Sequence, residues 1–139
     1  MKWYEYWKET RLKWHLSLGL GRQNYRFHDH EKLAHYANAA ADIEFNFPFG
    51  FKELEGIHSR TDFDLKAHEQ FSGKKLQYFD TETNSNYVPY VVETSVGLDR
   101  MFLSVFATSL KEETLEDGSI RTVLALPSVL APTTASFSS

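Results

Sequence analysis

Two alternating segments joined by a tight break constrain the fold of this chain more than any other feature. In DIEFNF (residues 42–47) apolar and polar residues alternate, as they do in a strand with one buried face. The residues PFG (48–50) break this strand, and FKELEGIHS (51–59) has the pattern of the returning strand of a hairpin. Because strand side chains alternate with a period of two, we expect Glu53 and Glu55 on the same face of the sheet.

The N-terminal segment is unusually rich in aromatic residues and predicts a helix that ends at the pair Gly19 and Gly21. Large residues are expected near one face of this helix: Trp3, Tyr6, Trp7, Trp14 and Leu18. Three tryptophans on one helix require a large covering surface, so we expect these side chains in a core or at an interface.

The rest of the chain alternates between helical and extended patterns. Helices are expected over EKLAHYANAAA (31–41), over DFDLKAHEQF (62–71) with Thr61 as N-cap, and over GLDRMFLSVFATSLKEE (97–113). Strands are expected over KLQYFD (75–80), YVPYVVETS (87–95) and RTVLALP (121–127), with RQNYRFHDH (22–30) as a polar link and APTTASFSS (131–139) as a frayed end. Strands that follow one another through short turns, with helices between some of them, predict an α+β fold with an antiparallel sheet flanked by helices.

Composition excludes several classes of function. The 139 residues, 42% of them hydrophobic, suit a single domain with a real core. The net charge of −4 gives no general basic surface for a nucleic-acid backbone. The absence of cysteine excludes disulfides and thiolate chemistry, and the six histidines lack the spacing of a zinc site, so no metal site is expected. The apolar runs are too short to cross a membrane, and we expect a soluble cytoplasmic protein.

The pattern Glu93, Ser95 and Arg100 is the one most suggestive of chemistry. A strand that ends in Glu-x-Ser puts a carboxylate and a hydroxyl on one face, and Gly97 then starts a helix. Arg100 in the first turn opposes the helix macrodipole by ~0.3–1 kcal/mol unless an anion occupies the helix start. The pattern therefore indicates a site for a small polar ligand and a phosphate. The alternative is an ordinary surface salt bridge between Glu93 and Arg100, worth ~0–1 kcal/mol, beside glutamates on a solvated sheet face.

Three segments carry a resemblance to a known family: EKLAHYANAAADIEF (31–45), FPFGFKELEGIHSRTDFDLKAH (47–68) and PYVVETSVGLDR (89–100). In this order and at this spacing they resemble the C-terminal half of the catalytic domain of glycyl-tRNA synthetase of the homodimeric type, a class II aminoacyl-tRNA synthetase. The block GLDR is similar to the third class II signature, and ELEGIHSRTDFDL is more specific to the glycine enzyme. The resemblance implies that residues 1–132 form part of such a domain and that residues 133–139 are a disordered or non-family tail.

The resemblance implies a reaction and a role for each matching residue. The glycine carboxylate attacks the α-phosphate of ATP, with Mg²⁺, and the resulting glycyl-adenylate transfers glycine to tRNA(Gly). The implied glycine-binding residues are Glu93, Thr94, Ser95, Val96 and Gly97, and the implied ATP-binding residues are Glu53, Leu54, Gly97, Leu98, Asp99 and Arg100. Glu93 would accept hydrogen bonds from the glycine ammonium and Arg100 would clamp the terminal phosphate, which makes these two the implied catalytic residues.

The chain departs from the family pattern in several respects. Thr94 stands where the family usually has proline, which predicts a looser strand end. Nothing in the sequence resembles the first two class II signatures or an anticodon-binding domain. We therefore expect a fragment of a glycine–tRNA ligase that is inactive alone and able to self-associate. The alternatives are a truncated paralogue that binds nucleotide or glycine as a regulatory module, and a structural remnant without a ligand.

Overall fold

The computed structural model describes residues 1–133. The elements in chain order are α1 (Lys2–Ser17), the 3-10 helix η1 (Arg22–Asn24), β1 (Tyr25–Asp29), β2 (Ala39–Phe47), β3 (Gly50–Ser59), α2 (Phe63–Ser72), β4 (Tyr78–Asp80), β5 (Ser85–Tyr87), β6 (Val92–Val96), α3 (Leu98–Ser109), β7 (Leu110–Thr114), β8 (Ile120–Leu124) and the 3-10 helix η2 (Ser128–Leu130). The fold is α+β, as the sequence predicts. Residues 134–139, most of the expected tail, lie outside the described residues.

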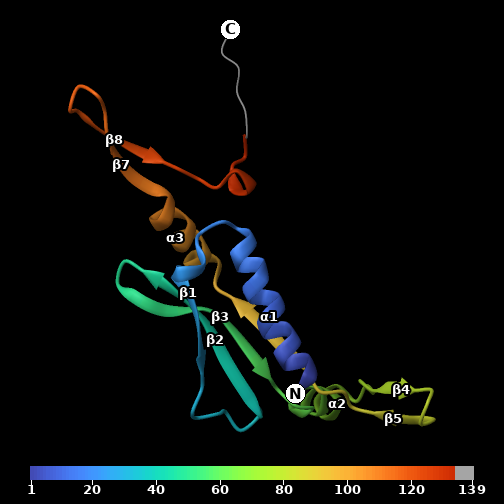
Figure 1. Cartoon of the computed structure of the whole chain (residues 1–139). Coiled ribbons are helices and arrows are strands. Elements are labelled where there is room, and N and C mark those ends of the chain that lie inside the picture. The colour runs from blue at the N-terminus through green and yellow to red at the C-terminus, as the bar shows by residue number, and fades with distance from the viewer. Residues whose placement is uncertain (134–139) are drawn as a thin grey trace.

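A four-stranded antiparallel sheet forms the centre of the molecule, in the order β1-β2-β3-β6. The hairpin predicted at residues 42–59 is confirmed as β2 and β3. Helix α1 lies across β3 and β6 and covers one face of the sheet (Figure 1). Two small hairpins, β4–β5 and β7–β8, project from opposite ends of the molecule (Figure 1).

The core lies between α1 and the sheet face that it covers. Its largest fully buried apolar side chains come from the central hairpin: Ile43, Phe45, Leu54 and Ile57. Helix α1 contributes Tyr4 and Leu12 to the same cluster. The prediction for α1 was therefore wrong about its face, because Trp3, Trp7 and Trp14 lie on the exposed side and Leu18 alone of the expected set is buried.

A β-bulge in the hairpin changes which face each glutamate of β3 occupies. Ile43 pairs with Glu55, but the next residue, Glu44, pairs with Glu53, so Leu54 is an extra residue in β3. Residues that pair across an antiparallel ladder point to the same face, and Ile43 and Glu44 point to opposite faces. The expectation that Glu53 and Glu55 share a face is therefore wrong: Glu55 faces α1, and Glu53 lies on the uncovered face.

Two further segments differ from their predictions because sheet pairing outweighs local propensity. Residues 31–38 form no helix, and residues 39–41 begin β2 by pairing with the end of β3. The expected polar link contains the edge strand β1, in which Tyr25 is buried and pairs with Phe45. Its alternating Tyr25 and Phe27 were the signal for a strand.

Several boundaries also shift. Asp62, not Thr61, is the N-cap residue of α2, and no side-chain hydrogen bond caps that helix. The expected strand 87–95 divides into the end of β5 and β6, separated by a segment that contains Pro89, which has no N–H to donate to a ladder. Helix α3 ends at Ser109, because Leu110 to Thr114 pair with β8 as β7.

Candidate functional site

The residues with implied functions come together where β3, β6 and the start of α3 meet. In the ladder between β3 and β6, Glu93 is opposite His58 and Ser95 is opposite Gly56. The ladder continues through Thr94, so the strand pairs regularly at the position where the family usually has proline. Beyond it, the backbone N–H of Gly97 donates to the carbonyl oxygen of Leu54, with 3.3 Å between N and O.

The alternation of β6 divides the implied glycine-binding residues between two faces. Thr94 is opposite Ile57 and Val96 is opposite Glu55, so both lie on the side of the sheet that faces α1. Glu93 and Ser95 therefore lie on the uncovered side. The bulge puts Glu53 on that side too, so two carboxylates and a hydroxyl of the implied site residues lie on one open face.

The carboxylate of Glu93 is held by Arg60. Its Oε2 lies 2.6 Å from Nη1 of Arg60, whose Nε and Nη2 donate to Asp64 over 2.6 and 3.1 Å. The guanidinium also lies over the ring of Tyr36, 4.2 Å from its centroid. The hydrogen bond to Asp64, with that to Glu93, raises the pKa of Arg60 above its usual value against the opposing effect of burial, and the same contact lowers the pKa of Asp64. Arg60 is thus a permanent cation beside Glu93.

Sequence reasoning missed Arg60. Its position four residues before Asp64 at the start of a predicted helix was the available signal, since residues at that spacing pair on a helix surface.

The alternative of a Glu93–Arg100 salt bridge is wrong, because each of these residues has a different partner.

Arg100 contacts the strand that carries the bulge. Its Nη1 donates to the backbone carbonyl of Glu53 and lies 3.4 Å from Oε2 of the same residue. No side chain caps the N-terminus of α3, where Gly97 is the N-cap residue and Asp99 lies in the first turn. Leu98 at this end is 82% exposed. Arg100 therefore compensates its unfavourable position in the helix by binding Glu53, and both side chains remain half exposed.

Gly56 lies directly opposite Ser95 and provides space on the uncovered face. A Cβ at this position would lie 2.8 Å from Cε1 of His58 and 3.7 Å from Oδ1 of Asp42. The imidazole of His58 thus lies over the glycine backbone, and its Nδ1 is buried with no hydrogen-bond partner among residues 1–133. A side chain at residue 56 would displace this ring from the open face.

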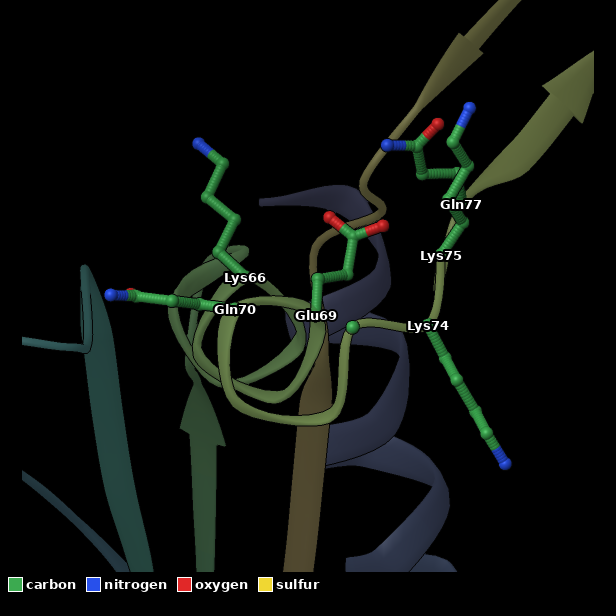
Figure 2. Close-up of a pocket in the computed structure, with 7 residues that line it drawn as sticks. Lys66, Glu69, Gln70, Lys74, Lys75 and Gln77 are labelled. Carbon is green, nitrogen blue, oxygen red and sulfur yellow. The ribbon is translucent and has the colours of Figure 1, made fainter.

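A separate hollow of about 400 Å³ lies at the C-terminal end of α2. Figure 2 shows its lysine side chains Lys66 and Lys74 pointing away from each other rather than converging. Its other lining residues are Glu69, Gln70, Gly73, Lys75 and Gln77. None of the implied site residues lines this hollow, so it is distinct from the site on β3 and β6.

Two further features of the described residues concern metal-binding groups and membrane-spanning helices. Within residues 1–133, no three histidine, aspartate or glutamate side chains group in a way that could hold a metal ion. Over the same range, the helices are too short or too polar to cross a lipid bilayer.

Comparison with known proteins shows which proteins the chain is similar to. The chain is 50% identical over 134 residues to a glycine–tRNA ligase of Geobacillus kaustophilus and 51% identical over 134 residues to that of Macrococcus caseolyticus. Each match covers 95% of the chain. The chain is homologous to part of glycine–tRNA ligase. The glycine–tRNA ligase of Chlorobaculum tepidum is 48% identical over 130 residues, or 93% of the chain. No family model matches the chain.

The homology confirms the resemblance drawn from the sequence motifs. The chain spans about 29% of the length of the Geobacillus ligase and 27% of the Chlorobaculum ligase. The matched region includes all the residues to which the family resemblance assigns a role, from Glu53 to Arg100, because the matches extend over nearly the whole chain.

Proposed function

We propose that this chain provides part of the glycine and ATP pocket of a class II catalytic domain, within a glycine–tRNA ligase. The observation that carries the proposal is the open sheet face on which Glu93 and Ser95 lie together, next to Arg100 and Glu53 at the start of α3. Identity of about 50% to glycine–tRNA ligases favours this function over a regulatory module.

On the glycine side, Glu93 accepts hydrogen bonds from the substrate ammonium. Arg60 orients the carboxylate of Glu93 through a charge-assisted hydrogen bond of 2.6 Å. Binding of the substrate to this fixed carboxylate therefore costs less conformational entropy than binding to a freely rotating side chain would. Ser95 adds a short polar wall. A pocket of this kind rejects alanine by collision, whereas rejecting a substrate smaller by one methylene would yield only ~1–3 kcal/mol.

On the ATP side, Arg100 and the free N–H groups at the start of α3 receive the phosphates. Glu53 and Leu54 lie against the nucleotide. The carboxylate of glycine attacks the α-phosphate and pyrophosphate leaves, so no side chain of the chain becomes a covalent nucleophile. Mg²⁺ bound to the substrate ATP would neutralise part of the phosphate charge.

We make three further proposals about the whole enzyme: its domain, its acceptor of glycine and its assembly. Residues 1–132 form part of the catalytic domain, the acceptor of glycine is tRNA(Gly), and the enzyme is a cytoplasmic homodimer. The support for these statements is the homology with glycine–tRNA ligases.

A graft tests the function directly. Residues 1–132 replace the homologous segment of the Geobacillus kaustophilus ligase, and glycine-dependent exchange of pyrophosphate into ATP is measured. We expect exchange in the graft and its loss in the same graft with Glu93→Ala. A matched control is Glu113→Ala, which removes an exposed carboxylate that pairs with Arg121 in the β7–β8 hairpin. A folded graft that exchanges no pyrophosphate contradicts the proposal.

A further inference from the structure

Glu55 is a buried carboxylate with no role in the proposed chemistry. It is 1% exposed and lies on the face of the sheet opposite to Glu93 and Glu53. Two residues of α1 bind it: Nε of Arg11 lies 2.5 Å from Oε1 and Nη2 lies 3.1 Å from Oε2, while Nε2 of His15 lies 2.6 Å from Oε2. Its register partners Ile43 and Val96 carry no charge, so α1 supplies the charged contacts of this carboxylate.

Burial alone does not explain this arrangement. Burial would raise the pKa of Glu55, but the hydrogen bonds from His15 and Arg11 outweigh it and lower the pKa below the usual value, so the carboxylate stays charged. A buried ion pair is often no more stabilising than well-packed apolar residues of similar volume. A charged glutamate does, however, fix the orientation of its side chain and the register of its strand, because its two carboxylate oxygens must meet hydrogen-bond donors at set positions.

Glu55 lies next to the bulge of β3. Glu55 is the residue directly after Leu54, the extra residue of β3. The carbonyl oxygens of Glu53 and Leu54 receive Nη1 of Arg100 and the N–H of Gly97, respectively. A shift of the bulge along β3 would turn carbonyl groups of this stretch toward the opposite edge of the strand, because strand carbonyls alternate between the two edges, and would weaken the contacts with Arg100 and Gly97.

We propose that Glu55 is a positioning residue for Arg100: bound by Arg11 and His15 on one face of the sheet, it fixes the bulge that receives Arg100 and the start of α3 on the other. Helix α1 is then coupled to the ATP side of the pocket through a single strand. The coupling itself concerns the chain alone; its effect on ATP rests on the proposed function.

Nuclear magnetic resonance of the 139-residue chain tests the coupling without any substrate. The side-chain N–H signal of Arg100, assigned by its loss in Arg100→Lys, is compared between the wild type and Glu55→Gln, which keeps the shape and removes the charge. We expect the Arg100 signal and the Gly97 amide signal to move toward the positions of unbonded groups. An Arg100 signal that stays in place in a folded Glu55→Gln chain overturns the proposal.

The matched control is Glu44→Gln. Glu44 flanks the same bulge from β2, on the uncovered face, where it pairs with Arg26 over 2.5 Å. Its substitution should leave the Arg100 signal unchanged, and equal shifts in both variants overturn the proposal. If Glu55→Gln does not fold, Arg11→Lys keeps the charge and loses the planar fork, and it should move the Arg100 signal in the same direction by a smaller amount.

In the grafted ligase, Glu55→Gln should raise the KM for ATP by roughly tenfold, since small misplacements of a binding group have large effects, and should leave the KM for glycine within about twofold. A purely structural role would lower the amount of active enzyme without separating the two constants. A moved Arg100 signal with an unchanged KM for ATP supports the coupling and counts against the ATP role of Arg100, so the two failures are distinguishable.

Discussion

The carboxylate of Glu93 accepts a hydrogen bond of 2.6 Å from Arg60, and this pair lies on the open face of the sheet next to Ser95. Arg60 has a second carboxylate partner in Asp64, so Glu93 is one of two anions around one cation. A substrate ammonium would add a second cation to the cluster and balance its charge. The electrostatics of the free site therefore favour a small cationic group.

Glu93→Gln should weaken the response of the grafted ligase to glycine. The substitution keeps the shape and weakens one charge-assisted hydrogen bond by ~1.5–3 kcal/mol, which corresponds to a roughly ten- to hundredfold loss of apparent glycine affinity. The ATP dependence should change less. Pyrophosphate exchange at varied glycine and varied ATP measures both, and equal small changes for the two substrates would contradict the role of Glu93.

Arg100→Ala should produce the complementary pattern. Loss of the proposed phosphate contact should weaken ATP binding and slow adenylate formation together, because the guanidinium would serve both the ground state and the transition state. The glycine dependence should change little. If Arg100→Ala impairs glycine and Glu93→Gln impairs ATP, the two roles are reversed.

Parts of the fold and the site could be predicted from sequence because they depend on short-range patterns. The alternation of residues 42–47 and the break at residues 48–50 were enough to predict the β2–β3 hairpin. The order of Glu93, Gly97 and Arg100 was enough to predict that a strand end meets a helix start. Family motifs then supplied the roles that the residue types alone left open.

The errors arose where long-range contacts decide the outcome. The bulge at Leu54 lies two residues before Gly56, and a glycine within a strand pattern indicates a bulge without fixing its position. The bulge reverses the face of Glu53 relative to Glu55. The buried face of α1 contains His15, although a hydrophobicity pattern excludes histidine from a core. His15 is buried because it binds Glu55, and a local pattern cannot reveal a partner that is 40 residues away in sequence. Arg60 was missed for the same reason, since its contact with Glu93 spans 33 residues.

The buried contacts of Glu55 predict a pH dependence of stability. Because the folded chain lowers the pKa of Glu55 from 4.5, the ionised carboxylate stabilises the fold above about pH 4.5, and this contribution is lost as the pH falls through the folded-state pKa. Glu55→Gln should lower the free energy of unfolding by about 1.5–3 kcal/mol near pH 7. The difference between wild type and variant should then shrink below about pH 4.5. Urea unfolding at several pH values measures the free energy of unfolding of both chains. A difference between them that grows as the pH falls would contradict a stabilising role of the ionised carboxylate.

The exposed aromatic face of α1 predicts self-association. Trp3 is 63% exposed and forms an edge-to-face cluster with Tyr6 and Trp7 on the side of α1 away from the sheet. Large exposed apolar patches commonly mark an interaction surface. We expect the sedimentation coefficient to rise with protein concentration and the double variant Trp3→Gln, Trp7→Gln to reduce this rise. Phe71→Gln is the control, since Phe71 is 86% exposed but lies on α2. A monomer at every concentration, with no binding of a hydrophobic dye, would be evidence against an interaction surface on α1.

The 139-residue chain alone should not activate glycine. Its sequence contains no segment resembling the second class II signature. The family resemblance implies that an arginine of that signature would hold the α-phosphate and the substrate carboxylate. In the proposed pocket Arg100 would bind the terminal phosphate and Glu93 the ammonium, but neither would align the attacking carboxylate with the α-phosphate. A misplacement of ~1 Å can reduce the rate about a hundredfold. Glycine-dependent pyrophosphate exchange by the purified chain should therefore lie at the level of a sample without enzyme, with the active graft as the positive control. Exchange at a rate near that of the graft would show that the chain aligns both substrates by itself.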